Sequence, residues 1–207
     1  MTSTDDIGTR IARRVQSLRT AQGLSLEALA TRAGVSRSMI SLIERNEASP
    51  TAVVLEKLAT GLGVVLATLF AADDDGIATD ATAATLSRQD GQTRWRDPHS
   101  GYVRRNVSPV HEATASGLAR SPIQIVEVEF PPGARVTYET AARHAPAHQQ
   151  VWLLDGAMQL TVGEITHELH AGDCLAFALD QPVSWFNPTA QVARYAVVIA
   201  SLPPSTF

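Results

Sequence analysis

The run from Leu26 to Arg45, LEALATRAGVSRSMISLIER, limits the folds open to this chain more than any other stretch. Its first half places Leu29 at helical spacing from Leu26, directly after Ser25, a residue type that caps helix N-termini. Gly34 follows, and glycine commonly ends helices because it adopts left-handed backbone angles without strain. The run therefore predicts two short helices joined by a glycine turn.

The second of these helices is expected to have one apolar side and one polar side. Ser36 is placed to cap its N-terminus, and Met39, Ile40 and Ile43 form its apolar side. Its outer side carries serines and arginines, namely Arg37, Ser38, Ser41 and Arg45. A short helix with a polar, cationic N-terminal face, supported by a preceding helix, suits insertion into the major groove of DNA.

The same run resembles the helix-turn-helix of phage-repressor-like (XRE-type) regulators. The resemblance rests on Ala30 where the two helices would touch, on Gly34 at the turn and on Ile40 in the core. The continuation NEASPTAVVLEKLATGLGV is also similar to that family, so the resemblance covers about residues 7–70. It implies a five-helix, all-α DNA-binding domain over residues 1–70, with a double-stranded DNA operator as partner. The alternative is an ordinary helical hairpin without a nucleic-acid role.

Base contacts are expected at the start of the second short helix. Arg37 and Ser38 stand there, and arginine bound to guanine is the commonest specific contact. Met39 and Ser41 are weaker candidates for base contacts. The residues expected to position phosphates flank them: Ser36, Arg45 and Asn46. A domain of this size contacts few base pairs, so we expect a homodimer on a two-fold-symmetric site with half-sites about 34–36 Å apart, or a multiple of that.

Two further positions qualify the resemblance. Arg19 could contact a phosphate, or, as the family implies, pair with Glu44 and brace the helices; we favour the brace. Leu26 is a departure, because several repressors place a DNA-contacting glutamine there. Specificity should therefore depend more on the second short helix.

Charge is distributed unevenly along the chain. The formal net charge is −4, which taken alone argues against a nucleic-acid partner. Residues 1–70 hold eight Arg or Lys and six Asp or Glu, whereas residues 71–207 hold nine and fifteen. The mildly basic part is thus the helix-turn-helix part, as DNA binding requires.

The sequence also bears on location. A single cysteine, Cys174, excludes an internal disulfide and fits a reducing compartment. No apolar run approaches the ~18 residues of a membrane span, and the first residues, MTSTDDIGTR, are too polar and acidic for a signal peptide. We therefore expect a cytoplasmic protein with no membrane partner.

The pattern of the chain changes twice. Helical spacing continues to residue 70, with predicted helices over residues 7–22, from Thr51 to Gly63 and over residues 64–70. Residues 71–92 hold small and acidic residues with few large apolar groups, which predicts a linker. Residues 93–207 show alternating apolar runs such as IQIVEVEF, separated by turn residues, and this predicts a β-sandwich or barrel.

Three segments of this last part, PPGARV, HQQVWLLDGAMQLTVG and LHAGDCLAFALDQPVSWFNP, resemble a cupin, which is a small jelly-roll barrel. The agreement lies mainly at turn positions: Gly133, Gly156, Gly172, Asp173, Pro182 and Asn187. The fold class expected for the whole chain is α plus β in separate domains, with an all-α helix-turn-helix domain and a C-terminal all-β cupin domain that dimerises.

Catalytic chemistry is not expected in the barrel. Cupin enzymes usually hold a metal with histidines and a carboxylate, a ligand set that suits iron or manganese. By the resemblance, the carboxylate position falls on Gln149 and one histidine position on Val183, and only His144 lies near a ligand position. We therefore expect no metal, no cofactor, no catalytic residue and no enzyme. A metal-dependent cupin enzyme with a helical appendage is the less favoured alternative.

A ligand pocket is the favoured interpretation of the polar and aromatic residues near the mouth of the barrel. These residues are His144, Gln149, Trp185 and Asn187, together with Tyr102, Arg104 and Tyr138. A mostly apolar cavity with a few hydrogen-bonding groups commonly holds small ligands, which predicts a small-molecule effector. The alternative is that these side chains fill a barrel that only dimerises. The whole chain is thus predicted to be a transcriptional regulator, with repression as the default because a bound dimer blocks polymerase.

Overall fold

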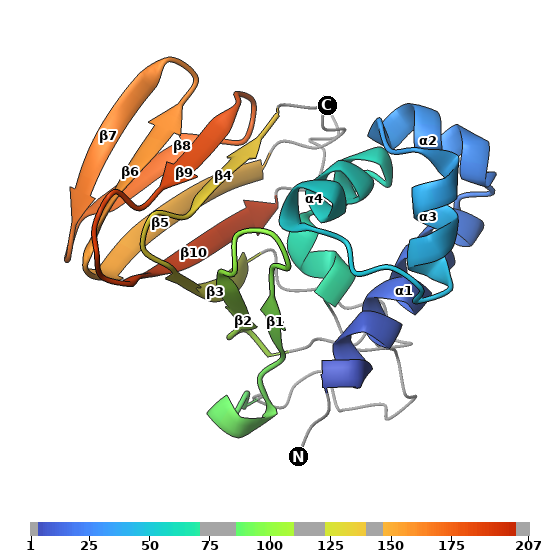
Figure 1. The fold of residues 1–207 in the computed structure, drawn as a ribbon, viewed down its shortest axis with the longest axis horizontal. Helices are drawn as coiled ribbons and strands as arrows, with labels where there is room; N and C mark the ends of the chain where they lie inside the picture. The colour runs from blue at the N-terminus through green and yellow to red at the C-terminus, as the bar shows by residue number, and fades with distance from the viewer. Residues whose placement is uncertain (1–3, 71–85, 110–122, 140–146, 202–207) are drawn as a thin grey trace, which may run out of the picture.

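The computed structural model describes residues 4–70, 86–109, 123–139 and 147–201. Helices occupy the N-terminal part and strands the C-terminal part, and the two lie against each other (Figure 1). The predicted fold class, an all-α helix-turn-helix part followed by an all-β part, is confirmed. Most of the predicted linker, residues 71–85, lies outside the described residues.

The helical part, residues 4–70, contains four α-helices. They are α1 (Thr4–Ala21), α2 (Leu26–Ala33), α3 (Arg37–Glu44) and α4 (Ala52–Gly61). The predicted caps are present, since the side chains of Ser25, Ser36 and Thr51 each accept a hydrogen bond from a backbone N–H of the following turn. Gly34 ends α2 with left-handed backbone angles, φ 61° and ψ 34°.

The fifth predicted helix differs from expectation. Residues Leu66–Phe70 form a 3-10 helix, η1, in place of an α-helix. The backbone N–H of Thr68 bonds to the carbonyl of Val65, three residues back, at 2.9 Å. The segment is five residues long and follows two β-branched valines, and such short turns are commonly 3-10.

The strands form two antiparallel sheets. One has the order β1-β2-β3-β10-β5-β8 and the other the order β4-β9-β6-β7. The first contains β1 (Arg94–Arg96), β2 (Val103–Asn106), β3 (Ile123–Phe130), β5 (Ala147–Asp155), β8 (Cys174–Ala178) and β10 (Ala193–Ser201). The second contains β4 (Arg135–Tyr138), β6 (Ala157–Val162), β7 (Ile165–His170) and β9 (Val183–Phe186). The rings of Trp185 and Tyr195 stack between the two sheets with centroids 5.0 Å apart.

Three strands escaped prediction from the sequence. β1 and β2 are three and four residues long and rich in arginine, so neither shows an alternating apolar pattern. β4 follows the Pro131–Gly133 turn and has only Val136 fully buried. A short η2 helix (Gln89–Gly91) also precedes β1, inside the segment predicted as linker.

Several contacts join the helical part to the sheets. The Phe70 ring lies 5.3 Å from the Trp95 ring of β1. The buried carboxylate of Asp97 accepts a 2.8 Å hydrogen bond from the backbone N–H of Ala52, in the first turn of α4. This bond satisfies one of the free N–H groups that every helix N-terminus carries. A residue of the β part thus caps a helix of the helical part.

None of the helices in the described ranges is both long and apolar enough to cross a membrane.

Candidate nucleic-acid interface and ligand cavity

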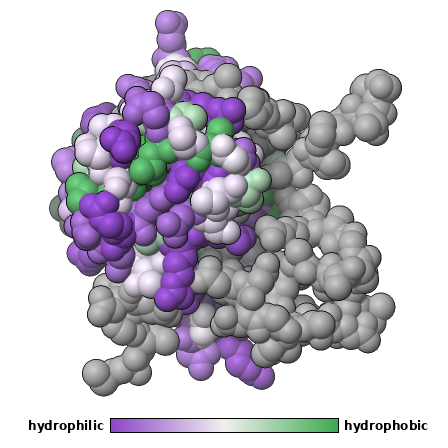
Figure 2. Space-filling view, turned by 90° about the vertical axis from the view of Figure 1, so that its right-hand side faces the viewer, coloured by the Kyte–Doolittle hydropathy of each residue, from purple (hydrophilic) through white to green (hydrophobic). Residues whose placement is uncertain are grey.

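The α3 helix has the two sides that the sequence predicts. Ile40 and Ile43 are buried in the helical core, whereas the N-terminal residues of α3 are exposed. The exposed residues are Ser36, Arg37, Ser38 and Met39, and Ser41 is half-buried. The side of the molecule on which α2 and α3 lie is mainly hydrophilic (Figures 1 and 2).

Ser36 caps the N-terminus of α3. Its hydroxyl accepts a 3.2 Å hydrogen bond from the Met39 backbone N–H and lies 3.2 Å from the Ser38 hydroxyl. The first turn of α3 carries no acidic residue, so the partial positive charge of the helix N-terminus is not neutralised by its own side chains. This end of α3 can therefore accept a phosphate or a base edge.

Arg45 and Asn46, predicted to contact phosphates, are both exposed, but their side chains already form hydrogen bonds within the protein. Arg45 donates to both carboxylate oxygens of Glu47, at 2.9 and 2.8 Å, and to the Ser41 hydroxyl. The hydrogen bonds with Glu47 raise the pKa of Arg45 and lower the pKa of Glu47. Asn46 ends α3 in a left-handed conformation, φ 56°, and its amide donates to the Thr9 hydroxyl at 3.1 Å.

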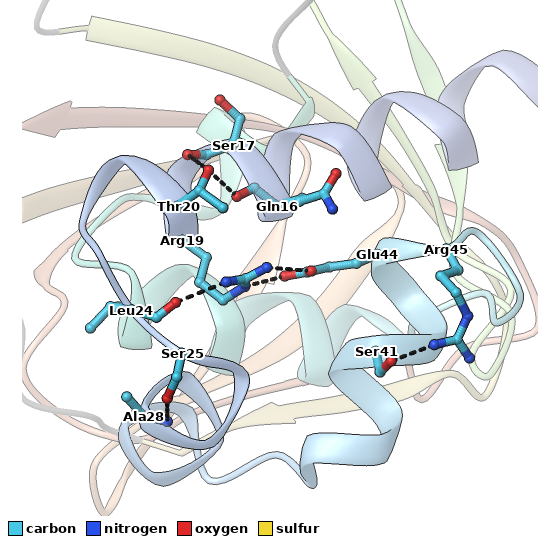
Figure 3. A network of polar contacts seen from close by, with 10 residues as sticks. All are labelled: Gln16, Ser17, Arg19, Thr20, Leu24, Ser25, Ala28, Ser41, Glu44 and Arg45. Carbon is cyan, nitrogen blue, oxygen red and sulfur yellow. Dashed lines mark hydrogen bonds and ion pairs between the residues drawn. The ribbon is translucent and has the colours of Figure 1, made fainter.

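Arg19 braces α1 against α3 (Figure 3). Its Nε and Nη2 donate to the two carboxylate oxygens of Glu44 at 2.6 and 2.8 Å, and its Nη1 donates to the Leu24 carbonyl at 2.8 Å. Both side chains are largely shielded from water, with 13% and 6% of their surface exposed. Hydrogen bonding to Glu44 raises the pKa of Arg19. The structure thus shows Arg19 paired with Glu44, the interpretation favoured from the sequence, and not free for a phosphate.

A cavity lies inside the β part, at its junction with the helices. Its volume is about 80 Å³, so it can admit a small molecule. The side chains of the described residues therefore leave free space inside the barrel. Both parts of the chain line the cavity, because Glu56, Val65 and Leu66 come from the helical part.

Five of the seven residues predicted for a ligand pocket line this cavity. They are Tyr102, Arg104, Tyr138, Gln149 and Trp185. The hydroxyls of Tyr102 and Tyr138 lie 3.2 Å apart. Burial raises the pKa of Tyr102 to about 12, so its phenol is a neutral hydrogen-bonding group. His144 lies outside the described residues.

The seventh residue, Asn187, is buried but does not line the cavity. Its side-chain amide donates to the carbonyls of Phe130, at 3.1 Å, and Gln191, at 2.7 Å. Its Oδ1 accepts from the backbone N–H and the hydroxyl of Thr189, at 3.0 and 2.8 Å. These bonds use the amide to hold the loop between β9 and β10, so it has a structural role.

Sequence reasoning missed two kinds of lining residue. Tyr195, Val197 and Ile199 alternate along β10, and this period-two pattern was a usable signal for one sheet face. Glu56 lies on α4, and no pattern in the sequence indicates that a helix closes the cavity. Among the described residues, no group of three or more His, Cys, Asp or Glu side chains could hold a metal ion.

Comparisons with known proteins agree with this arrangement. A family model described as helix-turn-helix (HTH_3) matches residues 15–69. The chain is 40% identical to the HTH-type transcriptional regulator SutR of Escherichia coli over 185 residues, which is 89% of this chain and 91% of that protein. It is 24% identical to the HTH-type transcriptional regulator PuuR of Escherichia coli over 208 residues, covering 98% and 99% of the two chains.

A solved structure resembles the whole molecule. The HTH_3 family transcriptional regulator from Vibrio cholerae matches with a TM-score of 0.73 at 25% identity, and the match covers 97% of this chain and 99% of that one. The match therefore includes both the helical and the β part. From the exposed α3 helix, the Arg19–Glu44 brace and these relatives together, the chain belongs to the HTH-type transcriptional regulators, which bind DNA through a helix-turn-helix.

Proposed function

We propose that the chain is a homodimeric regulator that binds a two-fold-symmetric operator and responds to a small molecule held in its β part. The observation that carries this proposal is the placement of the cavity, whose wall is shared by the DNA-binding part and the sheets. A ligand there contacts both parts at once. The ligand can therefore shift the equilibrium between two placements of the helical part relative to the sheets, provided that it binds one of these placements more tightly.

The DNA contacts proposed here follow from the exposure of α3. Arg37 reads a base, Ser38 supports it, and Met39 and Ser41 contribute weaker contacts from the same helix. Ser36, Arg45 and Asn46 position the phosphates. Arg45 must give up its ion pair with Glu47 to bind a phosphate, so this contact is weaker than one from an arginine without such a pair. Repression is the default outcome, because a bound dimer excludes polymerase from the site.

The proposed dimer contact is the outer face of the six-stranded sheet. Trp152 on β5 is 51% exposed there, and its strand neighbour across β10 is Ala196. Ile123 and Ile125 on β3 are also exposed apolar residues, and in the register of the sheet they lie on the same face as Trp152. A second copy of this chain would cover these side chains through a self-complementary contact, as a two-fold operator requires.

The oligomeric state tests this contact. Light scattering after size exclusion should give twice the chain mass of 22.1 kDa for the wild type, and half of that for Trp152→Glu. Ile165→Glu is the matched control, since Ile165 is an exposed apolar residue of β7 in the other sheet. A monomeric wild type, or dissociation by both variants alike, would overturn the proposed dimer.

The regulator is tested by fluorescence anisotropy with labelled DNA from immediately upstream of its own gene. Saturable binding well above a scrambled duplex, at two salt concentrations, is the expected result, because phosphate contacts alone would bind both duplexes equally and weaken together with salt. Equal binding to both duplexes at both salt concentrations would contradict an operator at that place.

The β part is proposed as a sensor and not as an enzyme. The positions that cupin enzymes would fill with a carboxylate and a histidine hold the neutral amide of Gln149 and the apolar side chain of Val183, and both line the cavity. Metal analysis of the purified protein is expected to find less than stoichiometric metal. The second candidate, a barrel that only dimerises, is opposed by the free volume of the cavity.

A further inference from the structure

One arginine inside the cavity has hydrogen-bond donors that no acceptor in the described part of the chain satisfies. Arg104 on β2 lines the cavity and is only 6% exposed. Among the described residues, neither its Nε nor its Nη2 has a hydrogen-bond partner. Trp185, which lines the same cavity, has an indole N–H without a partner in the described part of the chain. Three buried donor nitrogens are therefore left without an acceptor within the described ranges.

An arrangement of this kind is costly unless a ligand completes it. Removing a charged group from water costs several kcal/mol, and a guanidinium does not lose its proton at ordinary pH to avoid that cost. Burial nevertheless lowers the pKa of Arg104, which reflects the same unfavourable environment. The guanidinium lies 5.0 Å from the centre of the Phe70 ring, and this cation–π contact offsets only part of the loss.

The two free nitrogens belong to one edge of the guanidinium. In this same protein, Arg19 uses its Nε and Nη2 to grip both carboxylate oxygens of Glu44, and Arg45 uses the same two atoms on Glu47. Parallel N–H groups on this edge match the two oxygens of a carboxylate. In Arg104 this edge is buried, and no group of the residues that the structure describes occupies it.

We propose that the cavity binds a small organic monocarboxylate, whose carboxylate pairs with Arg104 and accepts a further hydrogen bond from Trp185. This proposal rests on the sensor role proposed above and names the chemical class of the effector. The body of the ligand packs against the apolar part of the lining, formed by Val128, Phe130, Val136, Val183, Val197 and Ile199.

The volume of the cavity and the charges in its lining narrow the class of ligand further. The cavity volume of about 80 Å³ limits the ligand to a small molecule. Two carboxylates, Glu56 and Glu139, also line the cavity, and Glu139 pairs with Lys57 at 3.0 Å. Lys57 compensates the charge of Glu139, but a second negative charge on the ligand would add to the repulsion from Glu56, so a monoanion is preferred over a dianion.

The same contact links the ligand to the DNA-binding part. Phe70, the last residue of η1, lies against Arg104, and Val65 and Leu66 line the cavity beside it. A carboxylate that draws the guanidinium toward itself changes the contact that holds η1. The effector should therefore alter the placement of the helices relative to the sheets, and with it operator affinity.

Thermal unfolding of the full chain provides the test. The probes are inorganic phosphate and three carboxylates, butyrate, isovalerate and succinate, at constant ionic strength. Each carboxylate is compared with its amide (butyramide, isovaleramide, succinamide). A probe at ten times its Kd should raise Tm by roughly 3–6 °C. Butyrate and isovalerate are expected to raise Tm, succinate to act more weakly, and the amides to have no effect.

Two variants assign the effect to the buried arginine. Arg104→Met is expected to abolish the response to carboxylates while its own Tm stays at or above that of the wild type, because an unpaired buried charge has been removed. Arg94→Gln is the control, since Arg94 is an exposed arginine on the neighbouring strand β1, paired with Glu129 at 2.9 Å. It should respond to the probes as the wild type does. Tryptophan emission, which includes Trp185, should change on adding the active probes and not with Arg104→Met.

Each other outcome overturns the proposal in a distinct way. Equal Tm shifts with acids and amides, or a Tm shift that persists in Arg104→Met, would show that the cavity binds ligands without recognising their negative charge through Arg104. A larger response to inorganic phosphate than to any carboxylate would assign the site to phosphate compounds. If no probe raises Tm at concentrations up to about 50 mM, the cavity is not an anion site. Operator binding is measured separately, so that result would not decide whether the chain binds DNA.

Discussion

The helical part contains two arginine–glutamate pairs with the same geometry but different environments, and their comparison tests how this fold is held together. Arg19–Glu44 and Arg45–Glu47 both join Nε and Nη2 to two carboxylate oxygens. The side chains of the first pair are 13% and 6% exposed, whereas those of the second are both 52% exposed. Water therefore screens the second pair and hardly reaches the first.

Neutralising one partner should then have unequal effects. Glu44→Gln leaves a shielded Arg19 with a much weaker acceptor, and breaking a buried pair in this way costs on the order of 3 kcal/mol. Glu47→Gln affects an exposed pair whose attraction is screened by water. For a chain of this length, 1 kcal/mol lowers Tm by about 2–4 °C, so we expect a fall of roughly 6–12 °C for Glu44→Gln and a much smaller one for Glu47→Gln.

Urea unfolding followed by far-ultraviolet circular dichroism measures both effects. Salt supplies an internal control, because raising it from 0.1 to 1 M shortens the Debye length from ~10 to ~3 Å. The effect of Glu47→Gln should then vanish, and that of Glu44→Gln should remain. The double variant Arg19→Met with Glu44→Leu should recover part of the lost stability, since apolar groups replace both charges. Equal losses for the two single variants would refute the reasoning.

Three further predictions concern DNA binding, packing and pH. Arg37→Ala should cost about 1–3 kcal/mol and relax preference at one base pair, whereas Arg45→Gln should weaken all duplexes alike, as competition with single-base variants of the operator would show. Gly61→Ala should lower stability by about 1–3 kcal/mol in urea unfolding, because the new Cβ would lie 2.8 Å from the Cβ of Ala33, and an unchanged midpoint would contradict that packing. Burial raises the pKa of Tyr102 to about 12 from about 10 in the unfolded chain, so the stability it contributes is present below pH 10 and is lost between pH 10 and 12. Absorbance at 295 nm should therefore show Tyr102 ionising only as the protein unfolds, and reversible ionisation of all three tyrosines near pH 10 would contradict its burial.

Much of the helical part could be predicted because its signals are local. Caps at Ser25, Ser36 and Thr51 and the glycine at position 34 fix where helices begin and end, and each depends on neighbours within four residues. The alternating pattern of β3 was equally clear, and its predicted bounds, Ile123–Phe130, agree with the structure. The Arg19–Glu44 brace is not local, and the family resemblance supplied it.

The features that escaped prediction depend on contacts between distant segments. β1 and β2 are short and rich in arginine, and they are strands because β3 offers a partner. The capping of α4 by Asp97 joins residues 45 positions apart, so no window of sequence could reveal it. Asn187 was predicted to face a ligand because it lies in a cupin-like segment, but the same side chain closes a loop through bonds to Phe130, Thr189 and Gln191.

The types of residue in the sequence predicted part of the cavity lining but not how its residues are paired. Tyr102, Arg104, Tyr138, Gln149 and Trp185 were expected near one another because polar and aromatic residues in a small barrel suggest a pocket, and the structure brings them together. Whether Arg104 is paired depends on every neighbouring element, and only the packed structure shows that two of its nitrogens have no partner among the described residues. The helices that complete the wall could not be placed from sequence.

Selection of binding sites from a random duplex library by the full chain tests the central claim most directly. The account predicts an enriched motif with two-fold symmetry, with half-sites about 10–10.5 base pairs apart or a multiple of that, and loss of the preference at one position of each half-site with Arg37→Ala. Enrichment of an asymmetric motif, a motif unchanged by Arg37→Ala, or no enrichment over the input library would contradict it.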